Sequence, residues 1–244
     1  MKLLVDAGNS RLKWRLDDQG RVVSNGIGAL DEPEWLAGLG PFADKISGVA
    51  VSTVASEGRR LDLVSQLARL TSAPVRFHWA ESQRSGLVNG YTDCQKMGAD
   101  RWHAMYAAWR RSDQGVAVVD AGSAVTVDYV SAGGQHLGGF ILPGLQMMVR
   151  SLRTDAARIG FDPSQALDTT PGLSTTQCVN HGLAWLTAAM VGRIHDDVKR
   201  AGLRQVLVTG GDADRLVGLG LNAVVARELV LDGLALIDEE DQRP

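Results

Sequence analysis

The segment Leu3-Leu4-Val5-Asp6-Ala7-Gly8-Asn9-Ser10-Arg11-Leu12-Lys13-Trp14 holds two apolar runs joined by a polar turn. The first run ends at Asp6, and beyond Gly8 the apolar Leu12 and Trp14 alternate with charged residues. This pattern predicts a strand, a tight turn and a second strand. Consecutive backbone N–H groups in such a turn hold phosphate oxygens well, because they form an anion-binding concavity. An ordinary hairpin is the alternative, since Asn and Gly suit such turns in any case.

The turn recurs in the second half of the chain, where residues 116–130 read Val-Ala-Val-Val-Asp-Ala-Gly-Ser-Ala-Val-Thr-Val-Asp-Tyr-Val. Val5-Asp6-Ala7-Gly8 aligns with Val119-Asp120-Ala121-Gly122. A repeat at about half the chain length predicts two similar subdomains, each presenting its Asp-containing turn to a shared cleft. The repeat favours phosphate binding for both turns.

Composition limits the class of protein. A chain of 244 residues holds one large domain or two small ones. Its content of 45% hydrophobic and 22% charged residues is that of an ordinary globular protein. The formal net charge of −3 provides no basic field, which argues against nucleic acid as a main partner. An anion site built from backbone amides is still allowed.

Cysteine and histidine show no metal or disulfide pattern. Cys94 and Cys178 are far apart in sequence, and the five histidines are scattered without metal-ligand spacing. The chain begins directly with the predicted strand, with no apolar leader, and no run approaches the ~20 apolar residues of a membrane span. We therefore expect a cytoplasmic protein with no membrane partner.

The rest of the pattern predicts alternating strands and helices. The acidic residues 238–241 at the end are expected to be solvated. Strands are expected at 22–27, 46–53, 74–79, 115–120, 205–209 and 223–226, with a strand that breaks within 138–144, and helices at 33–40, 56–72, 145–153, 176–201, 212–218 and 228–237. A further helix is expected after Gly98, with Trp102, Met105, Tyr106 and Trp109 as its apolar stripe.

Two further places have two interpretations each. Asp100 stands where a helix N-cap would lie, with Arg101 solvated beside it, so a purely structural role is one interpretation. Gly210-Gly211 follows a strand and precedes a helix, so it would either approach an adenine or ribose through its backbone or form a simple tight turn.

Several motifs now coincide in order and spacing, and together they resemble those of the type III pantothenate kinases, a family in the actin-like superfamily of acetate and sugar kinases. They cover nearly the whole chain, and Gly-Ala-Asp-Arg in its place between the two turns is the most specific. The matching pieces are Asp6-Ala7-Gly8-Asn9-Ser10-x-x-Lys13, Asn89-Gly90-Tyr91, Gly98-Ala99-Asp100-Arg101, Asp120-Ala121-Gly122-Ser123-Ala124-x-Thr126, Gly138-Gly139-x-x-x-Pro143-Gly144, Thr175 and Thr209-Gly210-Gly211.

The resemblance implies an α/β fold of duplicated actin-like (ribonuclease H-like) subdomains with an interdomain cleft. Residues 1–113 would form the first subdomain, with a phosphate turn and the pantothenate loop. Residues 114–244 would form the second, with the other phosphate turn and an adenosine motif. The implied activity is ATP-dependent phosphorylation of pantothenate to 4'-phosphopantothenate, the first step towards coenzyme A. A homodimer, Mg²⁺ with ATP and a monovalent cation (K⁺ or NH₄⁺) are also implied.

The resemblance further implies a role for each matching residue. Asp100 would be the general base and Asp120 the ligand of the monovalent cation. Ser123 stands where Thr is usual in the family, and the hydroxyl group is retained. The ATP-binding residues would be Asp6, Ala7, Gly8, Asn9, Ser10, Arg11, Leu12, Lys13 and Ser123, and the pantothenate-binding residues Tyr91, Gly98, Ala99, Asp100, Arg101 and Thr175.

Structural alternatives accompany these roles. The carboxylates of Asp6 and Asp120 would repel phosphate, so they suit cations or cation-bound water, unless they only shape their turns. Tyr91 would otherwise pack in the core, and Thr175 would otherwise cap a helix.

Two other functions compete with pantothenate phosphorylation. One is a kinase or phosphatase of the same superfamily that acts on a sugar or polyphosphate. The other is a non-catalytic nucleotide-binding regulatory protein or an actin-like filament, since fold does not determine function.

Overall fold

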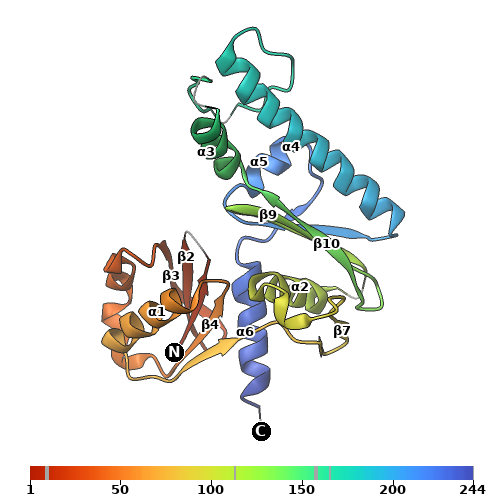
Figure 1. Ribbon diagram of the computed structural model, residues 1–244. Helices are drawn as coiled ribbons and strands as arrows, with labels where there is room; N and C mark the ends of the chain where they lie inside the picture. The colour runs from red at the N-terminus through yellow and green to blue at the C-terminus, as the bar shows by residue number, and fades with distance from the viewer. Residues whose placement is uncertain (9–10, 113, 157–158, 165, 244) are drawn as a thin grey trace. The chain divides into compact units, whose positions relative to one another are not determined.

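The computed structural model describes residues 1–8, 11–112, 114–156, 159–164 and 166–243 (Figure 1). The predicted turn residues Asn9 and Ser10 lie outside the described residues. The chain divides into two compact units, and both draw on more than one stretch of it. The first unit contains residues 1–85, 91–110 and 228–244, and the second contains residues 86–90 and 111–227.

The first unit is built on a five-stranded sheet of order β3-β2-β1-β4-β5. β1 pairs with β2 in antiparallel fashion and with β4 in parallel fashion. The carboxyl ends of the parallel strands β1, β4 and β5 therefore lie at one edge of the sheet. The elements of this unit are β1 (Lys2–Ala7), β2 (Leu12–Asp18), β3 (Arg21–Gly28), η1 (Pro33–Lys45), β4 (Gly48–Thr53), α1 (Glu57–Leu70), β5 (Val75–His78), β6 (Gln83–Arg84), η2 (Cys94–Lys96), α2 (Ala99–Arg111) and α6 (Leu229–Asp241).

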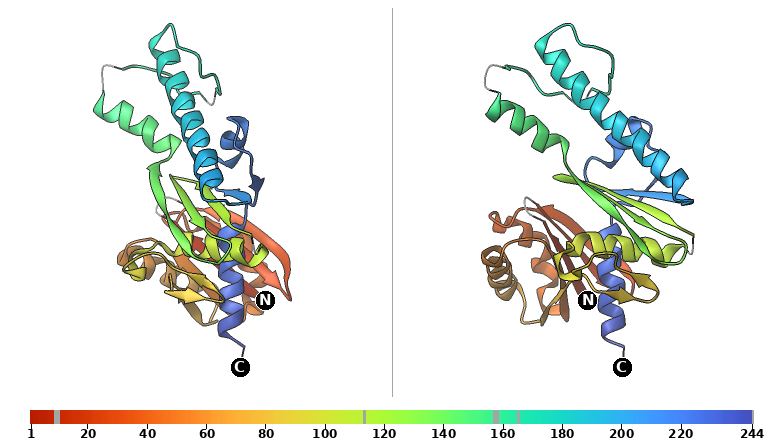
Figure 2. Two further views of the ribbon diagram at one scale, coloured as in Figure 1. Left: turned by 90° about the vertical axis from the view of Figure 1, so that its right-hand side faces the viewer. Right: turned by 45° about the vertical axis from the view of Figure 1, so that its right-hand side comes forward.

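The two faces of this sheet are buried against different helices, because successive side chains of a strand point to opposite faces. Leu3 and Val5 of β1 pack in one core with residues of η1 and α1. Leu4 packs in a second core with Leu231 and Leu234 of α6, which runs along the sheet in Figure 2. Asp6 lies two residues after Leu4 on β1, so its side chain is on the same face of the sheet, which α6 covers.

The predicted helix at 33–40 is a 3₁₀ helix that continues to residue 45. Pro41 lies inside it and cannot donate an intrahelical hydrogen bond, which explains why a longer α-helix does not form.

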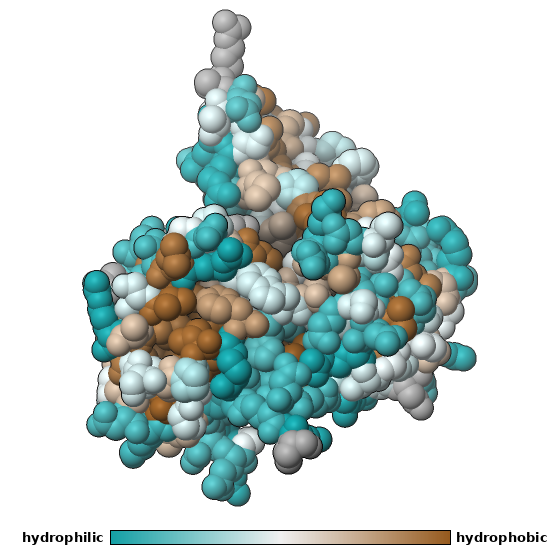
Figure 3. Space-filling model, turned by 60° about the horizontal axis from the view of Figure 1, so that its bottom comes forward, coloured by the Kyte–Doolittle hydropathy of each residue, from teal (hydrophilic) through white to brown (hydrophobic). Residues whose placement is uncertain are grey.

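Some apolar side chains of the first unit are exposed, among them Leu61 and Val64 of α1. On the face shown in Figure 3, apolar residues gather in several patches, the broadest at the left of the view, within a largely hydrophilic surface.

The second unit repeats the same sheet, with order β10-β9-β8-β11-β12. β8 pairs with β9 antiparallel and with β11 parallel, as β1 pairs with β2 and β4. This shared strand order confirms the duplicated fold. The elements are β7 (Leu87–Val88), β8 (Val116–Ala121), β9 (Ala124–Val130), β10 (His136–Pro143), α3 (Leu145–Asp155), α4 (Thr175–Arg200), β11 (Gln205–Thr209), α5 (Ala213–Gly218) and β12 (Val224–Val225).

Helices α4 and α5 cover one face of the second sheet. Val191 and Ile194 of α4 and Leu216 of α5 pack against alternate residues of β8, such as Val119. Asp120 follows Val119 and therefore lies on the opposite face, in the position that corresponds to Asp6 in the first unit. Among the described residues, no helix is long and apolar enough to cross a membrane.

Residues 238–241 at the end of α6 were expected to be solvated, which is wrong for Asp238, whereas Glu239 and Asp241 are exposed. The side chain of Asp238 is fully buried and pairs with Lys2, with Arg76 (2.8 Å) and with His78 (3.0 Å). Tyr106 and Arg110 of α2 donate hydrogen bonds to Glu240. The charges of the tail therefore bind α6 to the first unit, since buried carboxylates need such partners.

Hydrogen bonds decide the charge state of Asp238. Burial alone would raise its pKa, but hydrogen bonds from His78, Arg76 and Lys2 outweigh burial and hold the pKa well below its ordinary value. The stabilisation is therefore present at neutral pH and is lost as pH falls below the ordinary carboxyl pKa of 3.8.

We predict that Asp238→Asn lowers the free energy of unfolding at pH 7 by about 3 kcal/mol, because it leaves the partly buried Lys2 and Arg76 without their anion. Urea unfolding monitored by circular dichroism measures the change, and the difference from wild type should shrink as pH falls below 3.8. Glu239→Gln is the control, since Glu239 is exposed on the same helix. Equal stability of Asp238→Asn and Glu239→Gln at pH 7 would contradict the prediction.

Candidate active site

The first predicted phosphate turn follows β1, and Asp6 near the end of that strand has polar neighbours. Asp6 lies directly opposite Lys13 on β2 and beside Ser52 on β4. Opposite charges in such a cross-strand pair attract each other. The turn itself is closed by the N–H of Gly8, which donates to the carbonyl of Arg11 at 3.0 Å. Beyond it the side chain of Leu12 is buried, so this residue offers only backbone groups to a ligand.

The end of β4 and the segment after it are part of the same edge, although the sequence motifs did not point to them. Thr53 donates its hydroxyl to the carbonyl of Ala7 at 2.9 Å and accepts the N–H of Ala55 at 3.0 Å. The N–H of Val54 also points to the carbonyl of Ala7, at 3.4 Å. The available signal was the expected strand 46–53 with its small polar end, because parallel strands gather their carboxyl ends at one edge.

Asp100 lies in the first turn of α2, which begins one residue before it. Its Oδ1 accepts the N–H of Arg101 at 2.7 Å, while the carbonyl of Gly98 accepts the N–H of Trp102. Asp100 is therefore not the residue that precedes the helix, as the N-cap interpretation required. A Cβ atom on Gly98 would lie 2.5 Å from Asp100 Oδ1, so this turn needs glycine.

Arg101 is buried rather than solvated, which corrects the structural alternative for this residue. Its guanidinium donates to the hydroxyl of Tyr91 at 2.7 Å and lies 5.5 Å from the centre of the Tyr91 ring. Tyr91 is only partly buried, so it is not a core residue. The two side chains hold each other in place through a hydrogen bond and a cation–π contact.

A buried hydrogen bond ties α2 to β4. Nδ1 of His103 lies 2.8 Å from the hydroxyl oxygen of Ser52, the neighbour of Asp6 on the sheet. Burial lowers the pKa of His103 from 6.5 to about 3, helped by the charges of His78 and Arg84, so the ring is neutral at physiological pH. The first unit thus brings Asp6, Lys13 and the start of α2 to the edge of one sheet.

The second phosphate turn has the same construction. Asp120 lies opposite Thr126 on β9 and beside Thr209 on β11. The N–H of Gly122 donates to the carbonyl of Ala124 at 2.9 Å and closes the turn. The carbonyl of Ser123, which lies within this turn, accepts the N–H of Gly144 at 3.1 Å.

The Gly210-Gly211 loop packs directly against this turn. Gly210 has a φ of +91°, and a Cβ atom there would overlap the carbonyl of Ala121 and lie 2.6 Å from Asp120 Oδ1. Asp212 donates its N–H to the same carbonyl at 2.9 Å. Glycine is required here for both the left-handed backbone and the close approach.

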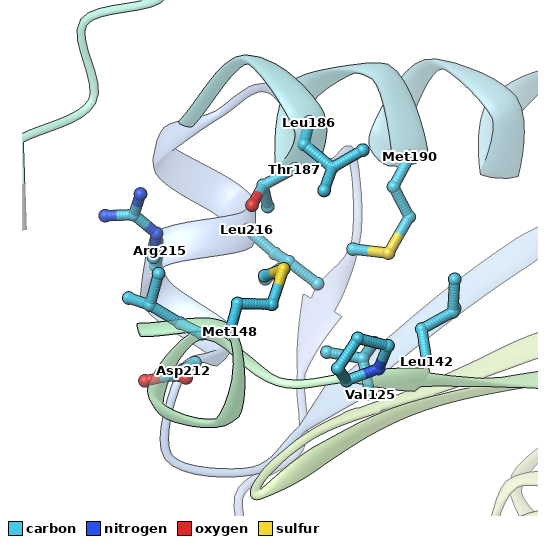
Figure 4. A pocket seen from close by; sticks show the side chains of 11 residues that line it. Val125, Leu142, Met148, Leu186, Thr187, Met190, Asp212, Arg215 and Leu216 are labelled. Atoms are coloured by element: carbon cyan, nitrogen blue, oxygen red, sulfur yellow. The ribbon is translucent and has the colours of Figure 1, made fainter. Parts of the chain in front are cut away.

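An apolar pocket opens beside the loop (Figure 4). Met148 of α3, Met190 of α4 and Leu216 of α5 point into it, and Asp212 and Arg215 lie at one side. The hydroxyl of Thr187 donates to the carbonyl of Leu183 in its own helix, so it adds little polarity to the wall. The full lining is Val125, Leu142, Pro143, Leu145, Met148, Leu186, Thr187, Met190, Asp212, Arg215 and Leu216.

Two residues of predicted motifs, Thr175 and Gly90, belong to the second unit but do not line the apolar pocket. Thr175 is the first residue of α4, and the cap is Ser174, which accepts the N–H of Gln177, so Thr175 is not the N-cap. Thr175 stands about 18 Å along the helix from Thr187 at the pocket, at 1.5 Å per residue. A Cβ atom on Gly90 would overlap the carbonyl of His136, whose ring pairs with the buried Asp128 at 2.9 Å.

Comparison with known proteins identifies the family. The family model described as type III pantothenate kinase matches residues 2–197. A type III pantothenate kinase of Marinobacter nauticus is 59% identical over 237 residues, which cover 97% of this chain and 98% of that protein.

Solved structures share the fold. One from Campylobacter jejuni, described as a Baf family transcriptional activator, is 25% identical with a TM-score of 0.61 over 98% of both chains. One from Sinorhizobium meliloti, described as a 2-dehydro-3-deoxygalactonokinase, is 13% identical with a TM-score of 0.59 over the full length of both.

The family model and the full-length relative decide between the competing functions, because a sugar kinase or a non-catalytic protein would not be expected to match both. The structures confirm an actin-like kinase fold. This chain therefore belongs to the type III pantothenate kinase family, enzymes that phosphorylate pantothenate in the synthesis of coenzyme A.

Proposed function

We propose that Asp100 is the general base of pantothenate phosphorylation. The carboxylate takes the proton of the primary hydroxyl group of pantothenate while the hydroxyl oxygen bonds to the γ-phosphorus of ATP and ADP leaves. The observation that carries this proposal is the placement of Asp100 in the first turn of α2, where the Arg101 N–H fixes its Oδ1. An ordered carboxylate needs little rearrangement when the substrate arrives.

Arg101 and Tyr91 are the proposed anchors of pantothenate. The guanidinium group is always charged and carries five donors in a planar fork, which matches the geometry of a carboxylate. The hydrogen bond to Tyr91 holds it in place, and its charge suits the carboxylate of pantothenate or another of its oxygens. Gly98 and Ala99 provide backbone close to the substrate, and Thr175 would provide a hydroxyl group.

The phosphate turn of each unit is proposed to take part in binding ATP. In the first turn, residues 6–13 provide backbone N–H groups and the Lys13 ammonium, and in the second turn Ser123 provides a hydroxyl group. The apolar pocket beside Gly210 suits the adenine ring, because small-molecule sites combine apolar walls with a few polar groups. Binding in this way places charge against the phosphates and an apolar wall against the base.

Cations complete the proposed ATP site. Among the described residues, no group of three or more His, Cys, Asp or Glu side chains could hold a metal ion. A cation bound at either carboxylate would take its other ligands from phosphate, carbonyl and water oxygens. Mg²⁺ binds in this way when the protein supplies only one or two carboxylates. Asp6 would hold Mg²⁺ through water, and Asp120 would hold K⁺ or NH₄⁺. The bound cations would reduce the charge repulsion between ATP and the two carboxylates.

A homodimer is proposed from apolar side chains on α3 and α4 that remain exposed. Trp185 is 61% exposed on α4, Leu173 just before α4 is 97% exposed, and Met147 on α3 is 40% exposed. Large apolar groups in one region of a surface often mark an interface.

We place the enzyme in the cytoplasm, where ATP is available.

We predict that Asp100→Asn lowers kcat by ~10²–10⁴-fold, because the amide cannot accept the hydroxyl proton. Pantothenate-dependent ADP formation measures the rate, and nucleotide titration should show ATP binding largely unchanged. Asp62→Asn, an exposed carboxylate on α1, is the control and should keep full activity. An unchanged kcat in Asp100→Asn would remove Asp100 as the base.

We predict that Asp120→Ala weakens ATP use and abolishes stimulation by K⁺, because it removes the proposed cation ligand. Rates are compared with K⁺ and with Na⁺ at constant ionic strength, so that screening stays the same. If the variant retains the potassium dependence of the wild type, the cation binds at another place.

We predict that Trp185→Asp shifts the enzyme from dimer to monomer in sedimentation velocity, because a charge at the centre of an apolar interface is costly. Leu61→Asp is the matched control, since Leu61 is 65% exposed on α1 in the other unit. Dissociation in the control, or a dimer that survives Trp185→Asp, would argue against this interface.

A further inference from the structure

Val54 is an apolar side chain exposed next to the turn that carries Asp100. It is 36% exposed, and its Cγ1 lies 3.3 Å from the position of a Cβ atom on Gly98. Gly98 has no side chain, so Val54 fills the space beside the backbone of this turn. No sequence motif singled out Val54.

The main chain around Val54 is fixed from two sides. Its N–H points to the carbonyl of Ala7 at the end of β1, and the buried Thr53 bonds both Ala7 and Ala55. Thr53 and Ala55 are 1% and 6% exposed, so Val54 is the residue of this three-residue segment that offers a side chain to a ligand. A rigid main chain holds that side chain in one place.

The chemistry of pantothenate supplies a group for this side chain. The hydroxyl group that is phosphorylated belongs to a CH₂OH group, and the next carbon carries two methyl groups. Each methyl carbon is therefore three bonds from the reacting oxygen. When that oxygen is within hydrogen-bond reach of Asp100, the methyl groups lie within a few bond lengths of the Gly98 turn and can reach the side chain that lines it.

We propose that Val54 contacts the two methyl groups of pantothenate and is a specificity-determining residue of this kinase. The proposal rests on the proposed role of Asp100 as general base. Contact with Val54 removes apolar surface from water on both sides, which stabilises bound pantothenate. It also turns the hydroxyl group towards Asp100, because the methyl groups and the hydroxyl group extend from the same short segment of the substrate.

The test combines a variant with a substrate analogue. Val54→Thr keeps the shape of the side chain but replaces a methyl group by a hydroxyl group. With pantothenate, we expect KM to rise about 10-fold and kcat to change less than about twofold, since one apolar contact is worth about this much. With the analogue that lacks both methyl groups, the same variant should change KM less than about twofold. KM for ATP should stay unchanged.

Val64→Thr is the matched control, because Val64 is also 36% exposed but lies on α1. It should leave KM unchanged for both substrates, and thermal melting checks that each variant is folded. An equal rise in KM for pantothenate and the analogue would overturn the proposal, and so would an unchanged KM for pantothenate. Asp100→Asn measured beside them separates the two hypotheses, since loss of the base lowers kcat with either substrate.

Discussion

One backbone carbonyl at the end of each central strand organises the two units. The carbonyl of Ala7, where β1 ends, accepts the hydroxyl of Thr53 and faces the N–H of Val54. The carbonyl of Ala121, where β8 ends, accepts the N–H of Asp212. These donors lie at the end of the neighbouring parallel strand or in the segment that follows it. A strand end inside a protein needs such partners, because an unpaired buried carbonyl is costly.

This constraint brings two loops together at each sheet edge. In the second unit the Gly210 loop can reach Ala121 only because Gly210 lacks a Cβ atom and adopts a positive φ. In the first unit Thr53 uses its side chain for the same purpose, so the loop there needs no glycine. The duplicated sheet thus satisfies one requirement with two different local solutions. Asp6 and Asp120 precede these carbonyls by one residue, which fixes them on equivalent faces.

The sequence predicted the regular elements well because their signals are local. Alternating Leu12 and Trp14 and the repeated Asp-Ala-Gly turn specify strands and hairpins within a few residues. The burial of Arg101 and Asp238 could not be predicted in this way. Lys2 is distant in sequence from Asp238, and Tyr91 lies outside the helix that carries Arg101, so a charged residue looks solvated until its partners are known. Val54 was missed for a related reason, since a lone Val at a strand end resembles a core residue.

The position of α6 shows the same limit at the level of whole elements. A repeat in the sequence suggests consecutive halves, yet α6 packs against β1 and β4 of the first unit. The hydrophobic pattern of a helix says which of its faces is buried but not which sheet buries it. Contacts of Glu240 with α2 and of Asp238 with β1 and β5, all distant in sequence, hold α6 against the first sheet.

The hydrogen bond between Ser52 and His103 links this packing to catalysis. His103 lies one turn after Asp100 on α2, and its ring is neutral because burial lowers its pKa to about 3. A protonated ring would place an uncompensated charge in the core, which burial disfavours. Below pH 6.5 the unfolded chain takes up a proton that the folded chain does not, so acid weakens folding through His103. Between pH 4 and neutrality the folded ring keeps one charge state, and the proposed base is therefore held on a helix whose attachment to β4 does not titrate.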